Sequence, residues 1–346
     1  MKQFIKTALL FIMSIVVSGL IGESAARVGF PQWREFLSEW FMDRTVVPGF
    51  GAVLIGRAGF DGYFSQNNGD FRAHIKINDF GFRQPGPISD SDGRIWVVGD
   101  SYAFGWGVDG NQTTSSKLAA AAHIPTYNIA SPGADICGYQ ALVSRVPKKL
   151  KPRGIIVMLT LENDIRIYNC AAERKPMPSA SDASIRFNLP TAKEFMMKHS
   201  ALYNFSAVTV KRSSVLREFF VTVGLLARAH VKHGSFSAAD ITRRVASVIS
   251  ELKNLRDMVP VDTPFATLLI PARFEIRDND GLFRQLRETV KKQLLQHNFD
   301  VIDPFEAFRK AGFAATHFAH DGHWSPRGHE IAADAGAQWI QSRSLK

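Results

Sequence analysis

Residues 94–101 read Arg-Ile-Trp-Val-Val-Gly-Asp-Ser, a short apolar run that ends in a polar turn. Ile95 to Gly99 carries no charge, which is typical of a strand covered on both faces of a parallel sheet. The carboxyl ends of such strands border the ligand site, so we expect Ser101 at the mouth of that site. A serine there can be a nucleophile if a base reaches its hydroxyl, but Gly-Asp-Ser is also an ordinary strand-to-helix turn with a capping residue.

The same strand pattern recurs along the chain and alternates with helical patterns. Further strands are expected at 125–129, 154–161, 264–270 and 298–302, and helices at 114–123, 138–150, 239–258, 282–297 and 327–341. This alternation predicts an α/β fold, a doubly wound three-layer sandwich with five parallel strands.

Length and composition allow one large domain or two ordinary ones. The chain has 346 residues, of which 45% are hydrophobic and 21% charged, so wholesale disorder is excluded. We divide it into residues 1–26, an N-terminal extension at 27–93 with a β-rich segment and a linker, and the sheet domain at 94–346. Residues 165–238 interrupt the strand–helix rhythm. They are predicted to be a helical insertion, either a lid or a substrate-defining subdomain. It is expected to contain a Pro/Ser/Ala-rich linker at 175–184 and two helix-like patches at 192–205 and 213–230.

The first 26 residues determine the expected compartment. Lys2 and Lys6 precede a charge-free run at 7–22, which has the length of a signal-peptide core or a short membrane anchor. The basic flank should stay cytoplasmic, so the rest of the chain is predicted to face the periplasm, either anchored in the inner membrane or released. Ser24-Ala25-Ala26 offers a cleavage site that Glu23 weakens. The net charge of +10 favours acidic partners such as anionic lipid or acidic polysaccharide, but nucleic acid is not expected on that side of the membrane.

Polar groups follow the predicted strands at the points where ester chemistry needs them. Gly133 comes after the second strand and Asn163 after the third, so their N–H groups can converge on an oxyanion beside Ser101. Asp321 and His323 precede the last helix and supply a carboxylate and an imidazole base.

The ordered set Gly-Asp-Ser, Asn-x4-Gly, Asn-Asp and Asp-x-His resembles the SGNH hydrolases of the GDSL esterase and lipase superfamily over residues 94–342. The stretch Asn78 to Arg83 and the anchor-like start are similar to membrane-anchored bacterial envelope members. The resemblance implies a flavodoxin-like fold and serine ester hydrolysis or acyl transfer without a metal or other cofactor. It implies the following roles: nucleophile Ser101, base His323, orienting acid Asp321, an oxyanion hole of Ser101, Gly133 and Asn163, and structural support from Asp100 and Asp164.

Two departures from the family pattern are visible. The orienting acid usually stands three residues before the histidine, where this chain has His320, and Asp321 stands two before. Leu161 takes the place of a glycine ahead of Asn163. The Asp-x-His spacing is similar to that of some acetyl-transferring relatives, so Asp321 is kept as the acid.

The histidines and cysteines allow alternative interpretations. His317, His320, His323 and His329 could crowd around a metal, but the intervening Asp321 and Gly322 favour a loop, so no metal is predicted. His329 is expected to be structural, and Trp324 either lines the pocket or packs beneath it. Cys137 and Cys170 can pair in an oxidising compartment, which would tie the loop after Gly133 to the loop after Asn163.

The sequence therefore predicts a serine esterase or O-acetyltransferase that acts on O-acyl groups of cell-envelope or exported polysaccharide. The expected partners are an acylated glycan or small ester and the inner membrane. Two alternatives remain: a catalytically silent SGNH-like domain for glycan binding or export, and a lipase that cleaves long-chain esters.

Overall fold

The computed structural model describes residues 2–173, 189–226 and 237–345. The chain forms two compact units. The first comprises Met1–Trp40, Phe64–Gly69 and Ala180–Arg228, and the second Phe41–Tyr63, Asp70–Ser179 and Ala229–Lys346. The predicted boundaries after residues 26 and 93 and around 165–238 stay predictions.

The second unit is built on a five-stranded sheet in the order β6-β5-β7-β8-β9, in which all neighbouring strands are parallel. Its strands are β5 (Ile95–Gly99), β6 (Thr126–Ala130), β7 (Gly154–Thr160), β8 (Phe265–Ile270) and β9 (Asp300–Ile302). Nearly all their residues are buried, as the uncharged apolar runs predict. The predicted fold class is confirmed, and each predicted strand is found within two residues of its expected limits.

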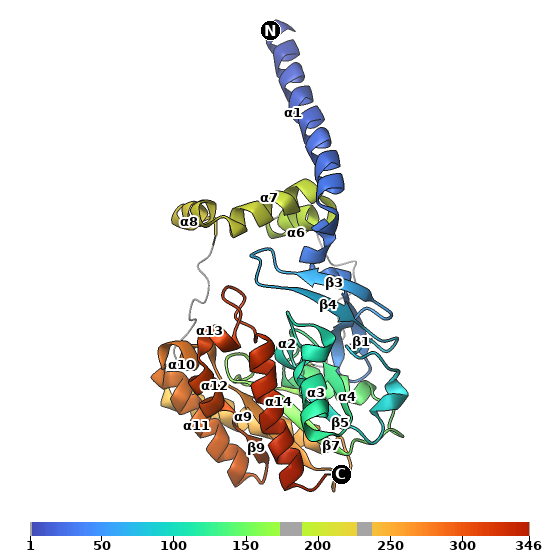
Figure 1. Ribbon diagram of the computed structural model, residues 1–346, viewed down its shortest axis with the longest axis vertical. Helices are drawn as coiled ribbons and strands as arrows, with labels where there is room; N and C mark the ends of the chain where they lie inside the picture. The colour runs from blue at the N-terminus through green and yellow to red at the C-terminus, as the bar shows by residue number, and fades with distance from the viewer. Residues whose placement is uncertain (1, 174–188, 227–236, 346) are drawn as a thin grey trace. The chain divides into compact units, whose positions relative to one another are not determined.

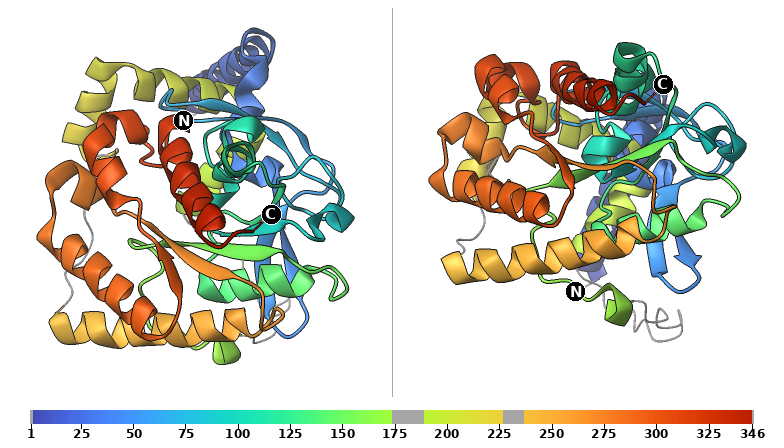
Figure 2. Two further views of the ribbon diagram at one scale, coloured as in Figure 1. Left: turned by 60° about the horizontal axis from the view of Figure 1, so that its bottom comes forward. Right: turned by 90° about the horizontal axis from the view of Figure 1, so that it is seen from below.

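Helices cover both faces of this sheet (Figure 2). On one face lie α4 (Ile136–Arg145), α9 (Ala238–Arg256) and α11 (Gly281–Gln296), whose apolar residues share one core cluster with the strands. On the other lie α3 (Thr114–Ala122) and α14 (Pro326–Ser342). All five agree with the helices predicted from apolar spacing. The one large difference is α4, which ends at Arg145 rather than at residue 150, because Pro147 disfavours helical backbone at Val146.

The second unit also contains shorter elements. They are the antiparallel hairpin β1 (Met42–Val47) and β2 (Gly51–Gly56), the strand β4 (Arg72–Lys76) with the first three residues of its partner β3 (Asp61–Ser65), and the helices α2 (Ser101–Phe104), α5 (Cys170–Glu173), α10 (Arg273–Asp278), α12 (Phe305–Ala311) and α13 (Phe313–Thr316). The 3-10 turns η3 (Ile88–Ser91) and η4 (Gly110–Gln112) complete the unit.

Arg83, the last residue of the Asn78–Arg83 stretch, is a buried clamp in this unit. Its guanidinium donates to the carbonyl oxygens of Phe104, Gly105 and Val108. Phe104 is the last residue of α2, and Gly105 and Val108 follow it, so Arg83 holds the C-terminal end of the helix that begins at Ser101. Burial lowers the pKa of Arg83 to about 9, so the side chain remains charged at neutral pH.

The first unit is helical (Figure 1). It contains α1 (Lys2–Gly29), η1 (Pro31–Phe36), η2 (Ser38–Trp40), α6 (Leu189–His199), α7 (Ala201–Arg212) and α8 (Ser214–Thr222). A small core joins Phe30, Trp33 and Phe36 to Ala201 and Val208. The predicted helical patch at 192–205 is divided between α6 and α7 by Ser200, which caps α7. The patch predicted at 213–230 is helical only from Ser214 to Thr222, with Ser213 as the cap of α8, and residues 227–230 lie outside the described residues. The predicted linker at 175–184 lies outside the described residues.

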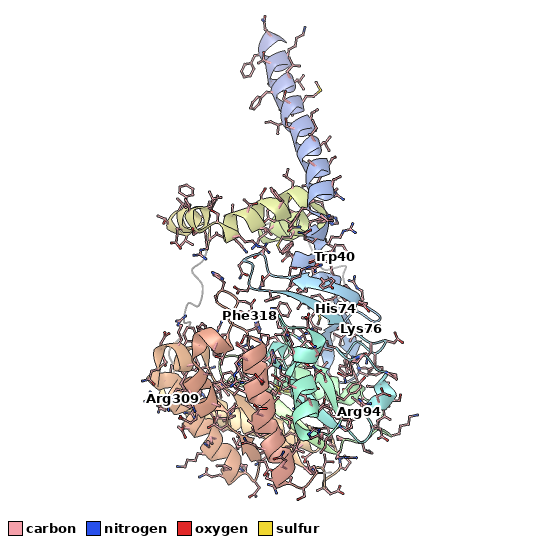
Figure 3. The ribbon with its side chains drawn as sticks, in the orientation of Figure 1. Trp40, His74, Lys76, Arg94, Arg309 and Phe318 are labelled. Carbon is pink, nitrogen blue, oxygen red and sulfur yellow. A yellow bond between two sulfur atoms is a disulfide. The ribbon has the colours of Figure 1, made fainter. Side chains whose placement is uncertain are left out.

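Helix α1 is long and apolar enough to cross a bilayer. Its apolar window has a mean hydropathy of 2.2 and is 0% buried within the structure. Side chains project from it in all directions (Figure 3). Length and composition of this kind also fit a signal sequence, so they do not by themselves distinguish anchoring from release.

Candidate active site

The nucleophile corner, residues Asp100–Gly105, joins β5 to α2. The Asp100 carboxylate accepts hydrogen bonds from the Tyr102 N–H at 2.9 Å and from the Thr160 hydroxyl at 2.8 Å. The Asn163 side chain donates to the same carboxylate. Gly105 ends the helix with a φ of 87°, a conformation that glycine adopts without steric cost. Ser101 is therefore fixed at the first helical position, directly after the strand.

Ser101, His323 and Asp321 form one hydrogen-bonded chain. The His323 Nε2 lies 2.8 Å from the Ser101 Oγ, and the His323 Nδ1 is bonded to an Asp321 carboxylate oxygen. The same oxygen accepts the backbone N–H of His323 at 3.3 Å. Ser101 is largely buried, with 9% of its surface exposed. This is the spatial arrangement of an activated serine nucleophile.

The histidine loop, residues Thr316–Ser325, carries the candidate base His323 and the candidate acid Asp321. Asp70, from the segment before β4, accepts the backbone N–H groups of His320 at 2.9 Å and Asp321 at 2.7 Å. It also bonds the His320 Nδ1 at 2.7 Å. The Tyr102 hydroxyl donates to the Gly322 carbonyl at 3.2 Å, which ties the loop to the nucleophile corner. Sequence reasoning missed Asp70, because no local pattern links it to a loop about 250 residues away.

Gly133 and Asn163 occupy the loops after β6 and β7, the two neighbours of β5. The Ser131 N–H donates to the Gly99 carbonyl at 3.2 Å, so the loop containing Gly133 begins beside the nucleophile corner. Gly133 has a φ of 76°, which favours glycine at this position. Asn163 is joined to the corner through Asp100. The structure thus places both predicted donors at the same edge of the sheet, and their oxyanion role stays a prediction.

Asp100 and Asp164 are both buried and support this edge. Asp164 accepts from the Tyr139 hydroxyl and the Thr160 N–H, each at 2.8 Å, and so joins the end of β7 to α4. Burial raises the pKa of Asp100, and its hydrogen bonds lower it only in part. Burial and the neighbouring Asp100 charge raise the pKa of Asp164 well above its usual value. Both predicted supports hold backbone or side chains next to the candidate catalytic groups.

The other clustered histidines have separate partners. His329 is fully buried and bonds the Thr114 hydroxyl at 2.9 Å, and burial lowers its pKa to about 3. His317 bonds the Thr316 hydroxyl at 2.9 Å. Within the described ranges, no three metal-ligating side chains gather around one point. Trp324 packs beneath the site, with ring centres 5.0 Å from Tyr102 and 4.8 Å from Phe308, and has no exposed surface.

A salt bridge that the sequence did not indicate lies at the same sheet edge. Arg273, which follows β8, is held by Glu162, which follows β7. Its Nη2 lies 2.8 Å from one carboxylate oxygen and its Nε 3.1 Å from the same oxygen. The pair is half-buried and joins the loops after two neighbouring strands, so it fixes the backbone on the Asn163 side of the site.

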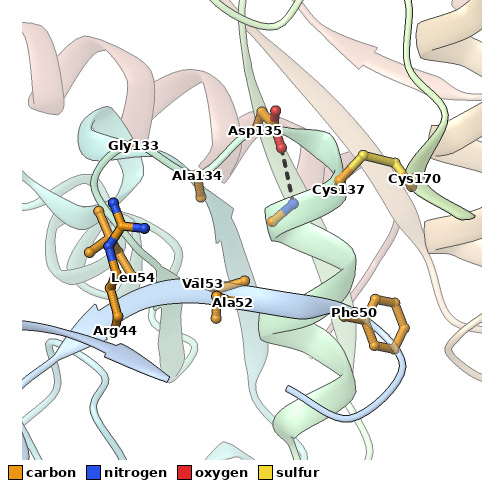
Figure 4. A pocket seen from close by; sticks show the side chains of 11 residues that line it. Arg44, Phe50, Ala52, Val53, Leu54, Gly133, Ala134, Asp135, Cys137 and Cys170 are labelled. Carbon is orange, nitrogen blue, oxygen red and sulfur yellow. Dashed lines mark hydrogen bonds between the residues drawn. A yellow bond between two sulfur atoms is a disulfide. The ribbon is translucent and has the colours of Figure 1, made fainter. Parts of the chain in front are cut away.

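A pocket of about 270 Å³ adjoins Gly133 (Figure 4). The β1–β2 hairpin forms one wall with Arg44 and Leu54, and the start of α4 forms another. Cys137 and Cys170 also line it and are joined by a disulfide. The disulfide connects the first turn of α4 to α5. It thereby ties the segment after Gly133 to the segment after Asn163, as the sequence-based hypothesis requires.

No protein-family model matches this chain, and no curated protein matches it. Solved structures do. A member of the lipolytic G-D-S-L family from Veillonella parvula shares 13% identity and a TM-score of 0.38, over 72% of this chain and 98% of that one. An acetyl xylan esterase from Butyrivibrio proteoclasticus shares 11% identity and a TM-score of 0.37, over 75% of this chain and 66% of that one.

An SGNH hydrolase from Slackia heliotrinireducens shares 13% identity and a TM-score of 0.35, over 71% of this chain and 98% of that one. Structures that bear the SGNH and GDSL names are thus among those that this chain matches. These are likenesses, and any conclusion about chemistry rests on the chain's own site.

Proposed function

We propose that this chain is a serine ester hydrolase or acyl transferase of SGNH type. The observation that carries the proposal is the hydrogen-bonded chain from the Ser101 hydroxyl through His323 to Asp321. Each group is also held by contacts of its own, Ser101 by the Asp100 cap and Asp321 by Asp70. Preorganised nucleophile, base and acid are what acyl transfer requires.

The reaction follows from this geometry. His323 Nε2 takes the proton of Ser101 as the hydroxyl oxygen attacks the ester carbonyl. The resulting imidazolium is stabilised by Asp321. It then returns the proton to the leaving alcohol, and the acyl group remains on Ser101. A water molecule or a sugar hydroxyl, deprotonated by His323, attacks the acyl-serine and releases a carboxylic acid or a new ester.

Negative charge develops on the carbonyl oxygen in the first step and must be stabilised by hydrogen-bond donors. The Ser101 N–H, the Gly133 N–H and the Asn163 amide are proposed for this role. The Asn163 amide has two N–H groups, so it can donate one to Asp100 and keep the other for the oxyanion. Each donor of an oxyanion hole is worth about a hundred- to thousandfold in rate.

The proposed location is the outer face of the inner membrane, with α1 retained as an anchor. The Glu23 carboxylate accepts from the Ser200 hydroxyl at 2.8 Å and the Ala201 N–H at 2.9 Å. Arg27 donates to the His199 carbonyl at 2.8 Å. Cleavage after Ala26 would remove Glu23 and leave the first turn of α7 without this cap. These contacts favour retention of the N-terminal helix.

The proposed substrate is a short O-acyl group, such as acetyl, on an envelope or exported polysaccharide. The pocket beside Gly133 supports this, because it adjoins a proposed oxyanion donor and can hold part of the molecule beyond the ester. Arg44 at its wall provides a donor for glycan hydroxyls or carboxylates. No cofactor takes part in the proposed reaction.

The test is hydrolysis of a p-nitrophenyl ester series of rising chain length by the detergent-solubilised full chain. Short esters should be cleaved fastest, and Ser101→Ala should lower kcat by about 10⁴-fold or more. Ser342→Ala, which alters a serine at the end of α14, is the matched control and should leave the rate unchanged.

The other results identify the alternatives. Preference for long-chain esters would favour a lipase. Activity that is indifferent to Ser101→Ala would overturn the serine mechanism. If the series is not cleaved, an acetylated oligosaccharide with a second sugar as acceptor separates a strict transferase, which moves the acetyl group, from a silent binding domain, which does not.

A further inference from the structure

Helix α8 is rich in apolar residues but contributes no buried residue to the structure. Val215, Leu216, Phe219 and Val223 are 76%, 38%, 58% and 50% exposed. At about 100° per residue these positions fall on one face of the helix. It is unfavourable to expose four apolar side chains on one helix face to water, so we expect an apolar partner to cover this face.

The first unit fastens α7, the helix before α8, to the proposed membrane anchor. Besides the contacts to Ser200 and Ala201, the Glu23 carboxylate accepts the Leu202 N–H at 3.0 Å. The Leu202 side chain packs against Gly22 so closely that a Cβ atom at Gly22 would lie 3.2 Å from it. The start of α7 is therefore held against α1 at residues 22 and 23.

This contact lies where α1 should leave the bilayer. Residues 7–22 carry no charge, and Glu23 is the first charged residue after them. Helices α7 and α8 then run crosswise to α1 (Figure 1). If α1 crosses the bilayer, α7 begins at its surface and α8 continues along that surface.

The charges of α6 to α8 suit an anionic surface. Their described side chains include five basic and two acidic residues, which gives 5 − 2 = +3: Lys193, Lys198, Lys211, Arg212 and Arg217 against Glu194 and Glu218. Helix α8 itself carries only Arg217 and Glu218 and has no net charge, so the excess positive charge lies on α6 and α7. Basic residues beside an apolar helix face favour the headgroup level of membranes that contain anionic lipid.

We propose that α8 lies in the headgroup region of the bilayer that α1 crosses, with Val215, Leu216, Phe219 and Val223 against the acyl chains. Its partner is anionic phospholipid. The inference rests on the proposed anchoring by α1 and extends it: the first unit is held to the membrane at two places, by a spanning helix and by a surface helix. A surface helix of this kind fixes the tilt and rotation of the unit relative to the bilayer, which a single spanning helix leaves free.

The test is spin-label accessibility in the full chain reconstituted in vesicles of phosphatidylcholine and phosphatidylglycerol. Both native cysteines are joined in the disulfide, so one introduced cysteine gives one labelling site. Phe219→Cys and Val215→Cys place labels on the apolar face. Glu218→Cys is the matched control, because the Glu218 side chain is 70% exposed and lies outside the apolar face. Leu9→Cys reports on α1.

The expected result is that the labels on the apolar face and the label at residue 218 differ in which of the two relaxation reagents, oxygen or nickel, reaches them better. Labels at 215 and 219 should collide more with membrane-dissolved oxygen than with a water-soluble nickel reagent, and the label at 218 should show the opposite order. Vesicles of phosphatidylcholine alone should weaken the contrast. The label at residue 9 should be oxygen-accessible in both kinds of vesicle.

Three results would overturn the inference. Nickel accessibility at 215 and 219, with residue 9 in hydrocarbon, would place α8 in water while anchoring by α1 stands. Shielding of 215 and 219 from both reagents would indicate that protein covers the face. Nickel accessibility at residue 9 would refute the anchor itself, and the surface helix with it.

Discussion

The nucleophile corner and the histidine loop are joined by two hydrogen bonds, one between Ser101 and His323 and one from Tyr102 to Gly322, yet they are held in different ways. The corner is fixed mainly by its own neighbours, the buried strand β5, the Asp100 cap and the helix end at Gly105. The loop is fixed by a residue from far along the chain, since Asp70 holds the backbone of His320 and Asp321. The positions of Ser101 and His323 therefore depend on contacts of different range: local ones around Asp100 and a long-range one from Asp70. Substitutions at these two places should have different effects.

The largest expected effect is a loss of catalytic rate when Asp321, on the histidine-loop side of the Ser101–His323 hydrogen bond, is changed. Asp321→Asn should lower kcat by about a thousand- to ten-thousandfold, because the amide no longer stabilises the imidazolium or enforces the correct tautomer. KM for a short ester should change little. Steady-state kinetics measure both. A loss below tenfold would show that another group orients His323.

The next effect concerns the loops beside the nucleophile corner. The disulfide closes a segment with a separation of 33 residues, so the double variant Cys137→Ser, Cys170→Ser should lose about 4 kcal/mol of stability. Urea unfolding under non-reducing conditions measures this loss. The wild-type chain, purified without reductant, should not react with a thiol reagent until a reductant is added. Reaction of both cysteines without reductant would contradict the bond.

A smaller loss of catalytic rate is expected when Asp70, which holds the histidine loop, is changed. Asp70→Ala should lower kcat about ten- to hundredfold with little change in KM, because two loop N–H groups lose their acceptor and the base moves. Asp70→Asn keeps an acceptor oxygen and should restore most of the rate. A residue that only stabilises the fold would show neither the kcat selectivity nor the rescue.

The matched control for Asp70 is Asp92→Ala. Asp92 also accepts a distant backbone N–H, that of Lys151 at 2.7 Å, but away from the site. Equal losses of kcat in the two variants would contradict a positioning role for Asp70.

The last prediction concerns stability rather than rate, and it distinguishes His329, which follows the loop, from the proposed base His323. The pKa of His329 is about 3 in the folded chain, against an ordinary value of 6.5, so the unfolded chain binds the extra proton first as pH falls. Stability from this group is present above about pH 6.5 and is lost toward pH 3, at about 1.4 kcal/mol per pH unit. In urea unfolding, His329→Gln should show a shallower acid loss than the wild type. Identical slopes would contradict the assignment.

The two regions also differ in how well the sequence predicts them. Strand, turn and cap of the nucleophile corner are adjacent in the chain, so residues 94–101 are sufficient to predict the strand and to place Ser101. The Asp-x-His pattern identifies His323 and Asp321, but Asp70 carries no signal of its own. Trp324 could line or underlie the pocket on sequence grounds, and only packing shows that it lies beneath.

The N-terminal unit shows the same limit. Its apolar N-terminal segment and two helix-like patches are predicted from the sequence, but such patterns do not say what an apolar face packs against. In the sequence, Glu23 stands out only as an unfavourable residue near a cleavage site. In the structure its carboxylate caps α7, a helix about 180 residues further along the chain. Long-range partners of this kind require the fold.

The most direct test of the central claim is whether Ser101 is a nucleophile activated by His323. The full chain would be treated with a fluorophosphonate probe, and the labelled peptide identified by mass spectrometry. We predict labelling at Ser101 that is slowed by at least about a hundredfold in His323→Ala and unchanged in His297→Gln, an exposed histidine at the end of α11. Labelling at another residue, or equal rates with and without His323, would contradict the claim.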